Sequence, residues 1–225
     1  MPTFFTWLRA LARDTRGVAM IEFAYVAPVV AALGMYGLEV TNLAITRMKV
    51  SQAAANLADN VSRMGDMNAL GVKSIREIDI NDSLAALSKQ SESYGLTTHG
   101  RVILSSLEHT DDDGQWIHWQ RCIGAKAWQS SYGHAGDGAG GAALTGMGPV
   151  GQEITAPDKS GVMFVEIAYD YQPLFGNALL GAQTIQTKSA FVVRDKRDFA
   201  DAKNPDNPSP MVPDAQKATC TASAS

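Results

Sequence analysis

The pattern of hydrophobic and polar residues begins with a long apolar segment near the N-terminus. Between residues 18 and 38 the only formally charged side chain is Glu22. Roughly 20 apolar residues, at about 1.5 Å of helical rise each, cross the hydrocarbon core of a bilayer, which is about 30 Å thick. The pattern therefore predicts one transmembrane helix, over 18–40.

Apolar positions continue at helical spacing beyond this predicted span. They recur at steps of seven, four, three, four and three residues, and they are Leu43, Val50, Ala54, Leu57, Val61 and Met64. Such a stripe is typical of a helix that packs one face against a folded domain, and Gly65 is a suitable C-terminal stop. We expect one helix of roughly 70 Å, in which 41–65 continues the span outside the membrane.

In the following region, one short helical pattern and several strand-like segments predict an α+β head domain over 66–200. A second helix is expected at 82–94, with Asp79, Asn81 or Asp82 as its N-cap and Gly95 as its stop. Four segments have the composition and alternation of strands, and the first two flank an Asp-Gly turn that predicts a hairpin. These segments are 101–109, 115–122, 162–171 and 184–194. The fold class is thus α+β, with an antiparallel sheet of about four strands in an order that the pattern does not predict.

Two stretches of the chain have neither a helical nor an alternating pattern of apolar residues. The glycine tract within 133–151 lacks the Lys-Ser/Thr ending of a nucleotide-binding loop, so we interpret it as a flexible surface loop. Residues 201–225 contain prolines with polar neighbours, which favours an irregular tail.

Charge gives the predicted span an orientation. Arg9, Arg13 and Arg16 precede it with Asp14 as their only acidic neighbour, and an excess of basic residues marks the cytoplasmic side. Residues 1–17 are then a cytoplasmic leader, and the head is exported. The net charge of −4, without a basic face, argues against a nucleic-acid partner.

A glycine and a carboxylate mark the start of the apolar segment. Gly17 precedes the segment, whereas an ordinary secretory signal has its small residues after about 7 to 15 apolar ones. Glu22 is the fifth residue after Gly17. A charge at the bilayer centre costs roughly 2.5 to 3.5 kcal/mol on insertion scales, so it usually has a partner or a function.

The sequence from Gly17 to Pro28, GVAMIEFAYVAP, resembles the start of the TadE-like minor pilins, or pseudopilins, of tight-adherence (type IVc) pilus systems. The resemblance is strongest over 13–65 and recurs weakly at 165–175, where a tyrosine-rich strand ends in proline. It implies cleavage between Gly17 and Val18 by a prepilin peptidase, with the helix left as an anchor in the bacterial inner membrane and the head in the periplasm. The implied partners are other pilins, the assembly platform and the lipid bilayer.

Glu22 has two interpretations. The resemblance implies that its carboxylate approaches the new N-terminal amine, of its own chain or of a neighbour, so that the two charges compensate each other. Alternatively, Glu22 lies only about one turn inside the membrane and extends to the headgroups.

Small residues are also spaced along one face of the predicted span, at Ala24, Ala27, Ala31 and Gly34. They would let another helix approach closely, although membrane helices are generally rich in alanine and glycine. Pro28 should kink or locally open the helix.

Cys122 and Cys220 are the only cysteines. An exported compartment permits a disulfide between them, which would close a loop of about 100 residues; two free thiols are the alternative.

Other candidate chemistry is weak. Asp111 to Asp113 lack the downstream glutamate of a calcium-binding loop, and the four histidines lack a zinc-binding spacing. We therefore expect no catalytic residue, no metal, no cofactor and no enzymatic activity. The predicted function is that of a structural minor pilin; the alternative is a membrane-anchored or pilus-tip adhesin. Trp116, Trp119 and Trp128 are expected to be core or sheet-packing residues, or, if exposed, a patch that binds a carbohydrate or partner.

Overall fold

The computed structural model describes residues 17–67, 73–109, 114–139, 144–194, 197 and 217–220. The leader before Gly17, the three aspartates at 111–113 and most of the predicted tail lie outside these residues. The chain divides into two compact units. We call the described residues of 1–44 and 173–181 the arm, those of 45–172 and 182–225 the head, and treat each by itself.

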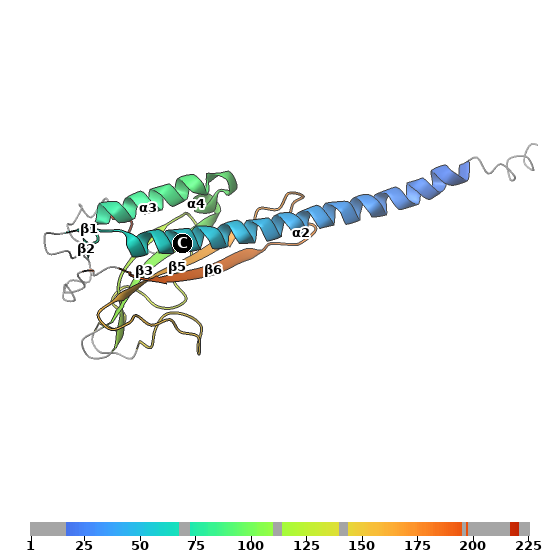
Figure 1. Ribbon diagram of the computed structural model, residues 1–225. Coiled ribbons are helices and arrows are strands. Elements are labelled where there is room, and N and C mark those ends of the chain that lie inside the picture. Colours follow the sequence, from blue (N-terminus) through green and yellow to red (C-terminus); the bar gives the residue numbers. More distant parts are fainter. Residues whose placement is uncertain are drawn as a thin grey trace, which may run out of the picture. The chain divides into compact units, whose positions relative to one another are not determined.

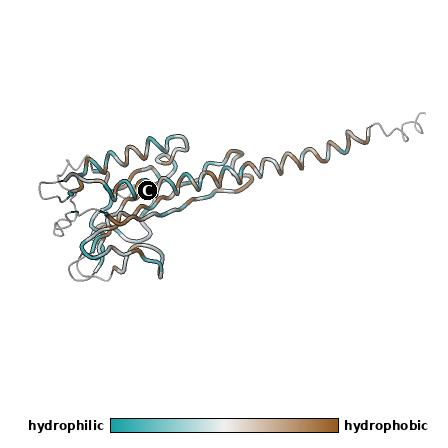
Figure 2. Tube along the Cα trace, in the orientation of Figure 1, coloured by the Kyte–Doolittle hydropathy of each residue, from teal (hydrophilic) through white to brown (hydrophobic). Residues whose placement is uncertain are grey.

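One helix, α2 (Val18–Arg63), contains the whole apolar segment and the predicted stripe as far as Val61 (Figure 1). The prediction of a single helix over 18–64 is therefore confirmed to within one residue. Pro28 lies inside α2 without ending it. An 18-residue window of α2 is apolar enough to cross a membrane and has no buried residue, and Figure 2 shows hydrophobic colour along the part of α2 that belongs to the arm.

The outer part of α2, residues 45–63, belongs to the head and buries the central four residues of the predicted stripe; Leu43 and Met64, at its two ends, are half-buried. Val50, Ala54, Leu57 and Val61 are at most 3% exposed. The Ser51 hydroxyl lies 3.3 Å from that of Thr187, so this part of the helix runs beside the last strand of the sheet.

Helix α3 (Glu77–Gln90) begins five residues earlier than predicted. The prediction was wrong because it required a capping side chain, whereas Arg76 precedes the helix in an extended conformation without a side-chain cap. The Arg76 guanidinium instead binds the Asp79 carboxylate at 2.8 Å, and acidic side chains in the first turn favour the helix dipole. After α3, the 3₁₀ turn η2 (Glu92–Tyr94) is followed by Gly95, the predicted stop, whose φ is 62°.

The head contains a four-stranded antiparallel sheet in the order β4-β3-β5-β6, which confirms the α+β class and the hairpin. The strands, preceded by the short helix α4 (Leu96–His99), are β3 (Gly100–His109), β4 (Gln115–Ile123), β5 (Gly161–Asp170) and β6 (Thr184–Val192). Sequence analysis did not predict the two-stranded sheet of β1 (Asp66–Met67) and β2 (Lys73–Ser74).

Each face of the four-stranded sheet is covered. On one face β6 lies against α2, and the buried pair Glu77–Arg121 joins α3 to β4. The other face packs against residues after β4, in a cluster of Leu107, Ile117, Met147, Ala156, Val162 and Phe164. Trp116 and Trp119 are at most 3% exposed, so their interpretation as core residues is confirmed, and this burial contradicts their proposed role as exposed ligand contacts.

Candidate functional site

The first candidate site is the start of α2, where Gly17 immediately precedes the first residue of the α-helix, Val18. Both residues are exposed. A Cβ built on Gly17 would meet nothing within 4 Å, so the described part of the chain leaves this peptide bond uncovered. An enzyme acting after Gly17 would release a chain whose first residue is already helical.

Glu22 lies in the second turn of this helix, and its side chain is exposed. Among the described residues, no other side chain forms an ion pair or hydrogen bond with it. Both interpretations of Glu22, pairing with an N-terminal amine and extension to the headgroups, therefore stay open.

The predicted small-residue face lies on the same part of α2. Ala24, Ala31 and Gly34 are exposed and Ala27 is half-buried. A Cβ built on Gly34 would have no neighbour within 4 Å. Within the described residues this face is free for contact with another helix.

Large apolar side chains surround these small residues and face outward. Met20 is 75%, Phe23 70% and Tyr25 77% exposed. Apolar surface in water costs roughly 25 cal/mol per Å², and soluble monomers rarely expose so continuous an apolar surface. This surface is suited to lipid or to contact with other helices, and the segment is long and apolar enough to cross a membrane.

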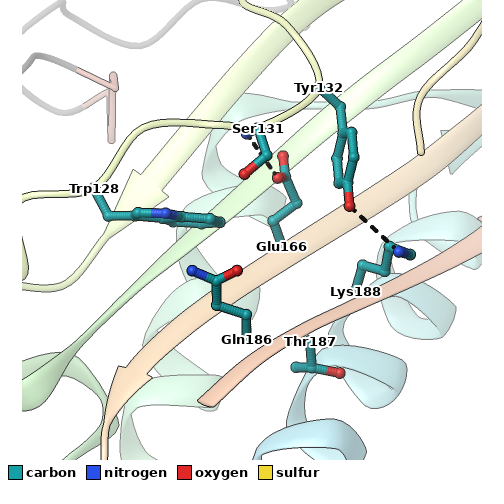
Figure 3. A pocket seen from close by; sticks show the side chains of 7 residues that line it. All are labelled: Trp128, Ser131, Tyr132, Glu166, Gln186, Thr187 and Lys188. Carbon is teal, nitrogen blue, oxygen red and sulfur yellow. Dashed lines mark hydrogen bonds between the residues drawn. The ribbon is translucent and has the colours of Figure 1, made fainter. Parts of the chain in front are cut away.

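The second candidate site is a pocket of about 390 Å³ on the sheet face opposite α2 (Figure 3). It lies between β5, β6 and the segment that follows β4. Its lining residues are Trp128, Ser131, Tyr132, Glu166, Gln186, Thr187 and Lys188.

Glu166 is the acidic group of this pocket and is only 1% exposed. The Ser130 hydroxyl donates a hydrogen bond to one carboxylate oxygen, and the backbone N–H of Ser131 donates to the other at 3.1 Å. Burial raises the pKa of Glu166 above its ordinary value, although these two hydrogen bonds oppose the shift. The pocket thus contains a carboxyl group that binds a proton more readily than one in water.

Two aromatic rings and a cation surround Glu166. Figure 3 shows the rings of Trp128 and Tyr132 on either side of its carboxylate. Lys188 is paired with Glu166 across the sheet, and its ammonium donates to the Tyr132 hydroxyl at 3.3 Å. The pocket therefore combines an aromatic surface with hydrogen-bond donors and acceptors, a combination suited to a polar ligand that has an apolar face.

The segment that carries Trp128 is also attached to the sheet before Trp128. Arg101 donates to the Gly124 carbonyl at 2.8 Å, and Lys126 binds both carboxylate oxygens of Asp170 at 2.7 and 2.6 Å. Gly124 has a φ of 113°, and a Cβ there would collide with the Gly100 carbonyl. These contacts determine where the segment crosses the sheet.

The histidines of the hairpin, His109 and His118, lie apart from each other. A bulge in the β3–β4 pairing places His109 opposite Gln115. His118 instead binds the buried Glu108 carboxylate at 2.8 Å, which also accepts from Ser106 at 2.6 Å. Among the described residues, no group of three or more His, Cys, Asp or Glu side chains could hold a metal ion.

The C-terminal segment is attached to β4. Cys122 and Cys220 form a disulfide with their Cα atoms 4.9 Å apart. The backbone N–H of Cys122 donates to Ala218 at 2.7 Å, and Thr219 pairs with Arg121 in an antiparallel bridge. Residues 217–220 therefore extend the edge of the sheet.

No family model matches the chain, and neither a curated protein nor a solved structure matches it. The candidate sites are therefore interpreted from their own residues.

Sequence analysis missed the pocket. Its signal was Glu166, a charged residue on an otherwise apolar strand, together with Gln186 and Lys188, which alternate onto the same face of the next strand. The contribution of Trp128 depends on the course of an irregular segment, which has no period.

Proposed function

We propose that the chain is a TadE-like minor pilin that is cleaved after Gly17, remains in the bacterial inner membrane through residues 18–40 of α2, and takes part in assembly of a tight-adherence pilus. Its head would be periplasmic, and its partners would be other pilins, the assembly platform and the prepilin peptidase. Its role would be structural rather than enzymatic.

The observation that carries this proposal is the exposed apolar surface of the arm directly after Gly17. Met20, Phe23 and Tyr25 require lipid or protein around them, and the small residues of the same helix allow close contact with a second helix. A cleaved chain would begin at Val18, about one helical turn from the Glu22 carboxylate. The three arginines of the leader support the orientation.

The role of Glu22 is tested by comparing two substitutions in the native host. Glu22→Gln keeps the size of the side chain and removes its charge; Glu92→Gln is the matched control on an exposed residue of the head, whose side chain is 70% exposed. We expect Glu22→Gln to reduce the amount of chain cross-linked to other pilins or recovered in sheared fibres, and the control to leave it unchanged. Normal assembly of the Glu22→Gln chain would contradict the pairing of Glu22 with an amine.

The pocket of the head supports a second candidate function, that of an adhesin. An aromatic ring beside carboxylate, amide and ammonium groups suits a saccharide, whose ring has an apolar face and whose hydroxyls donate and accept hydrogen bonds. Trp128 would stack on the sugar, and Gln186 and Lys188 would bind its hydroxyls.

This second candidate is tested on the full chain in detergent with an array of glycans. Trp128→Ala should abolish any glycan signal, whereas Val150→Ala, at a residue that is 98% exposed and outside the pocket lining, should retain it. A chain that binds no glycan, or binds one equally well without Trp128, would contradict the saccharide site.

A further inference from the structure

The connection between β5 and β6 has an unusual composition. No formally charged residue occurs between Asp170 and Lys188. Within this stretch, residues 173–181, which we call the interface loop, read PLFGNALLG and belong to the arm rather than the head. Turns between strands are normally polar, so four large apolar side chains in an uncharged loop require an explanation.

Glu39 of α2 accepts two hydrogen bonds from the interface loop. The backbone N–H groups of Leu174 and Phe175 donate to the two oxygens of its carboxylate, at 3.3 and 3.0 Å respectively. Glu39 is fully buried, although the helical residues on either side of it are exposed. Hydrogen bonds to a charged acceptor are stronger than neutral ones, and a carboxylate without them would be costly to bury.

The position of Glu39 along the helix is informative. Between 18 and 46 it is the only acidic or basic residue besides Glu22, and it directly follows the apolar segment 18–38. About 20 residues of helix span about 30 Å, so Glu39 lies where a membrane-spanning segment that starts at Val18 would leave the hydrocarbon. The backbone amides of Leu174 and Phe175 bind the Glu39 carboxylate, so they lie at this same depth along the helix.

The side chains of Leu174 and Phe175 face outward. Leu174 is 62% and Phe175 37% exposed, although the amides of both are held by a buried group. An apolar side chain that is exposed in this way, on an uncharged loop at the end of an apolar helix, is suited to the headgroup region of a bilayer.

We propose that the interface loop is a second membrane contact, which inserts Leu174 and Phe175 into the headgroup region of the leaflet on the side of the head. Its ligand is a lipid surface. Glu39 is the positioning residue: its carboxylate holds the loop against the helix and is itself kept out of the hydrocarbon by the two amides. The inference rests on the proposed function only in requiring that residues 18–38 span a membrane.

The test uses the full chain in vesicles of phosphatidylcholine and phosphatidylglycerol, with its disulfide intact. A spin label is attached to one introduced cysteine, in the variants Phe175→Cys, Leu33→Cys and Val150→Cys. Leu33 reports on the span and is 66% exposed in the structure; Val150 is 98% exposed and reports on the head in water. Power saturation measures the accessibility of each label to oxygen, which concentrates in lipid, and to a water-soluble nickel complex.

We expect the label at 33 to be accessible mainly to oxygen, the label at 150 mainly to nickel, and the label at 175 to shift from the value at 150 toward that at 33. If the label at 175 matches that at 150 while the label at 33 is in lipid, the inference is overturned and the membrane span stands. If the label at 33 is also in water, the span fails and the inference fails with it.

The role of Glu39 has its own variant. Adding Glu39→Ala to Phe175→Cys should shift the label at 175 back toward the nickel-accessible value, whereas Glu92→Ala on the head should not. The label at 33 is measured with Glu39→Ala to confirm that the helix still spans the vesicle membrane. An unchanged label at 175 in an inserted Glu39→Ala chain would overturn the positioning role.

Discussion

The two parts of α2, residues 18–38 and 45–63, are both rich in apolar residues, but only the second part buries them. Over 45–63 the apolar residues form a stripe, and Val50 and Leu57 are at most 3% exposed. Over 18–38 apolar residues surround the helix, and Phe23 is 70% exposed. A stripe can be buried by one folded domain, whereas an apolar surface on all sides requires a surrounding apolar medium. The comparison identifies the first part of α2 as the part that is long and apolar enough to cross a membrane.

The largest effect that separates the two parts is expected from the disulfide, which belongs to the head alone. Cys122→Ser should lower the free energy of unfolding of the head by at most about 4 to 5 kcal/mol, the chain-entropy value for a loop of about 100 residues. Urea denaturation in detergent measures it, with reduced wild-type protein as the control. Membrane association should be unchanged, and its loss would show that the arm depends on the head.

A smaller effect is expected from shortening one leucine in each part of the helix. Leu57→Ala should lower the free energy of unfolding of the head by about 3 kcal/mol, because it leaves a cavity in a packed core. Leu33→Ala, the same change on an exposed side chain, should alter it by less than about 0.5 kcal/mol. Equal effects in urea denaturation would contradict the difference in burial.

An added charge should affect the first part of α2 and not the outer part. The expected change in free energy is similar to that of Leu57→Ala or slightly smaller. Leu33→Lys should weaken membrane insertion by roughly 2.5 to 3.5 kcal/mol, if the residue lies near the bilayer centre. Gln52→Lys, on the exposed side of the outer part, should have no effect. The measurement is the fraction of chain that stays with membranes after alkaline extraction; equal retention of both variants would argue against a span.

The smallest effect concerns pH and is confined to the head. Burial raises the pKa of Glu166 in the folded state, so the folded chain binds this proton more tightly than the unfolded chain does. The stabilisation is complete below the unfolded pKa and is lost as the pH rises through the folded pKa. Glu166→Gln should remove this part of the decline in stability, measured by urea denaturation from pH 4 upward in steps. An identical pH profile in both proteins would contradict the shift.

The features that could be predicted were those with a periodic pattern of apolar residues. The helix over 18–64, the stripe through Val50 and Leu57 and the strands of the sheet follow from spacings of 3.6 and 2 residues, which local sequence determines. The start of α3 was missed because Arg76 replaces a capping residue with an ion pair to Asp79, a contact that no capping rule includes.

The features that depend on contacts between distant residues were not predictable. The attachment of the interface loop joins Glu39 to amides about 135 residues away, and the pocket joins Trp128 to two strands. Arg197 likewise donates to the carbonyls of Val61, Ser62 and Met64 at the end of α2. Backbone donors and acceptors carry no signal in the sequence that identifies their side-chain partners.

The most direct test of the proposed function is the N-terminal sequence of the chain extracted from the membranes of its native host. A matched chain with Gly17→Leu, which places a large side chain at the proposed cleavage site, is the control. The proposal predicts that the wild-type protein begins at Val18 and that the Gly17→Leu chain keeps its leader. A wild-type chain that still begins at Met1, or one cut beyond the apolar segment, would contradict processing as a pilin.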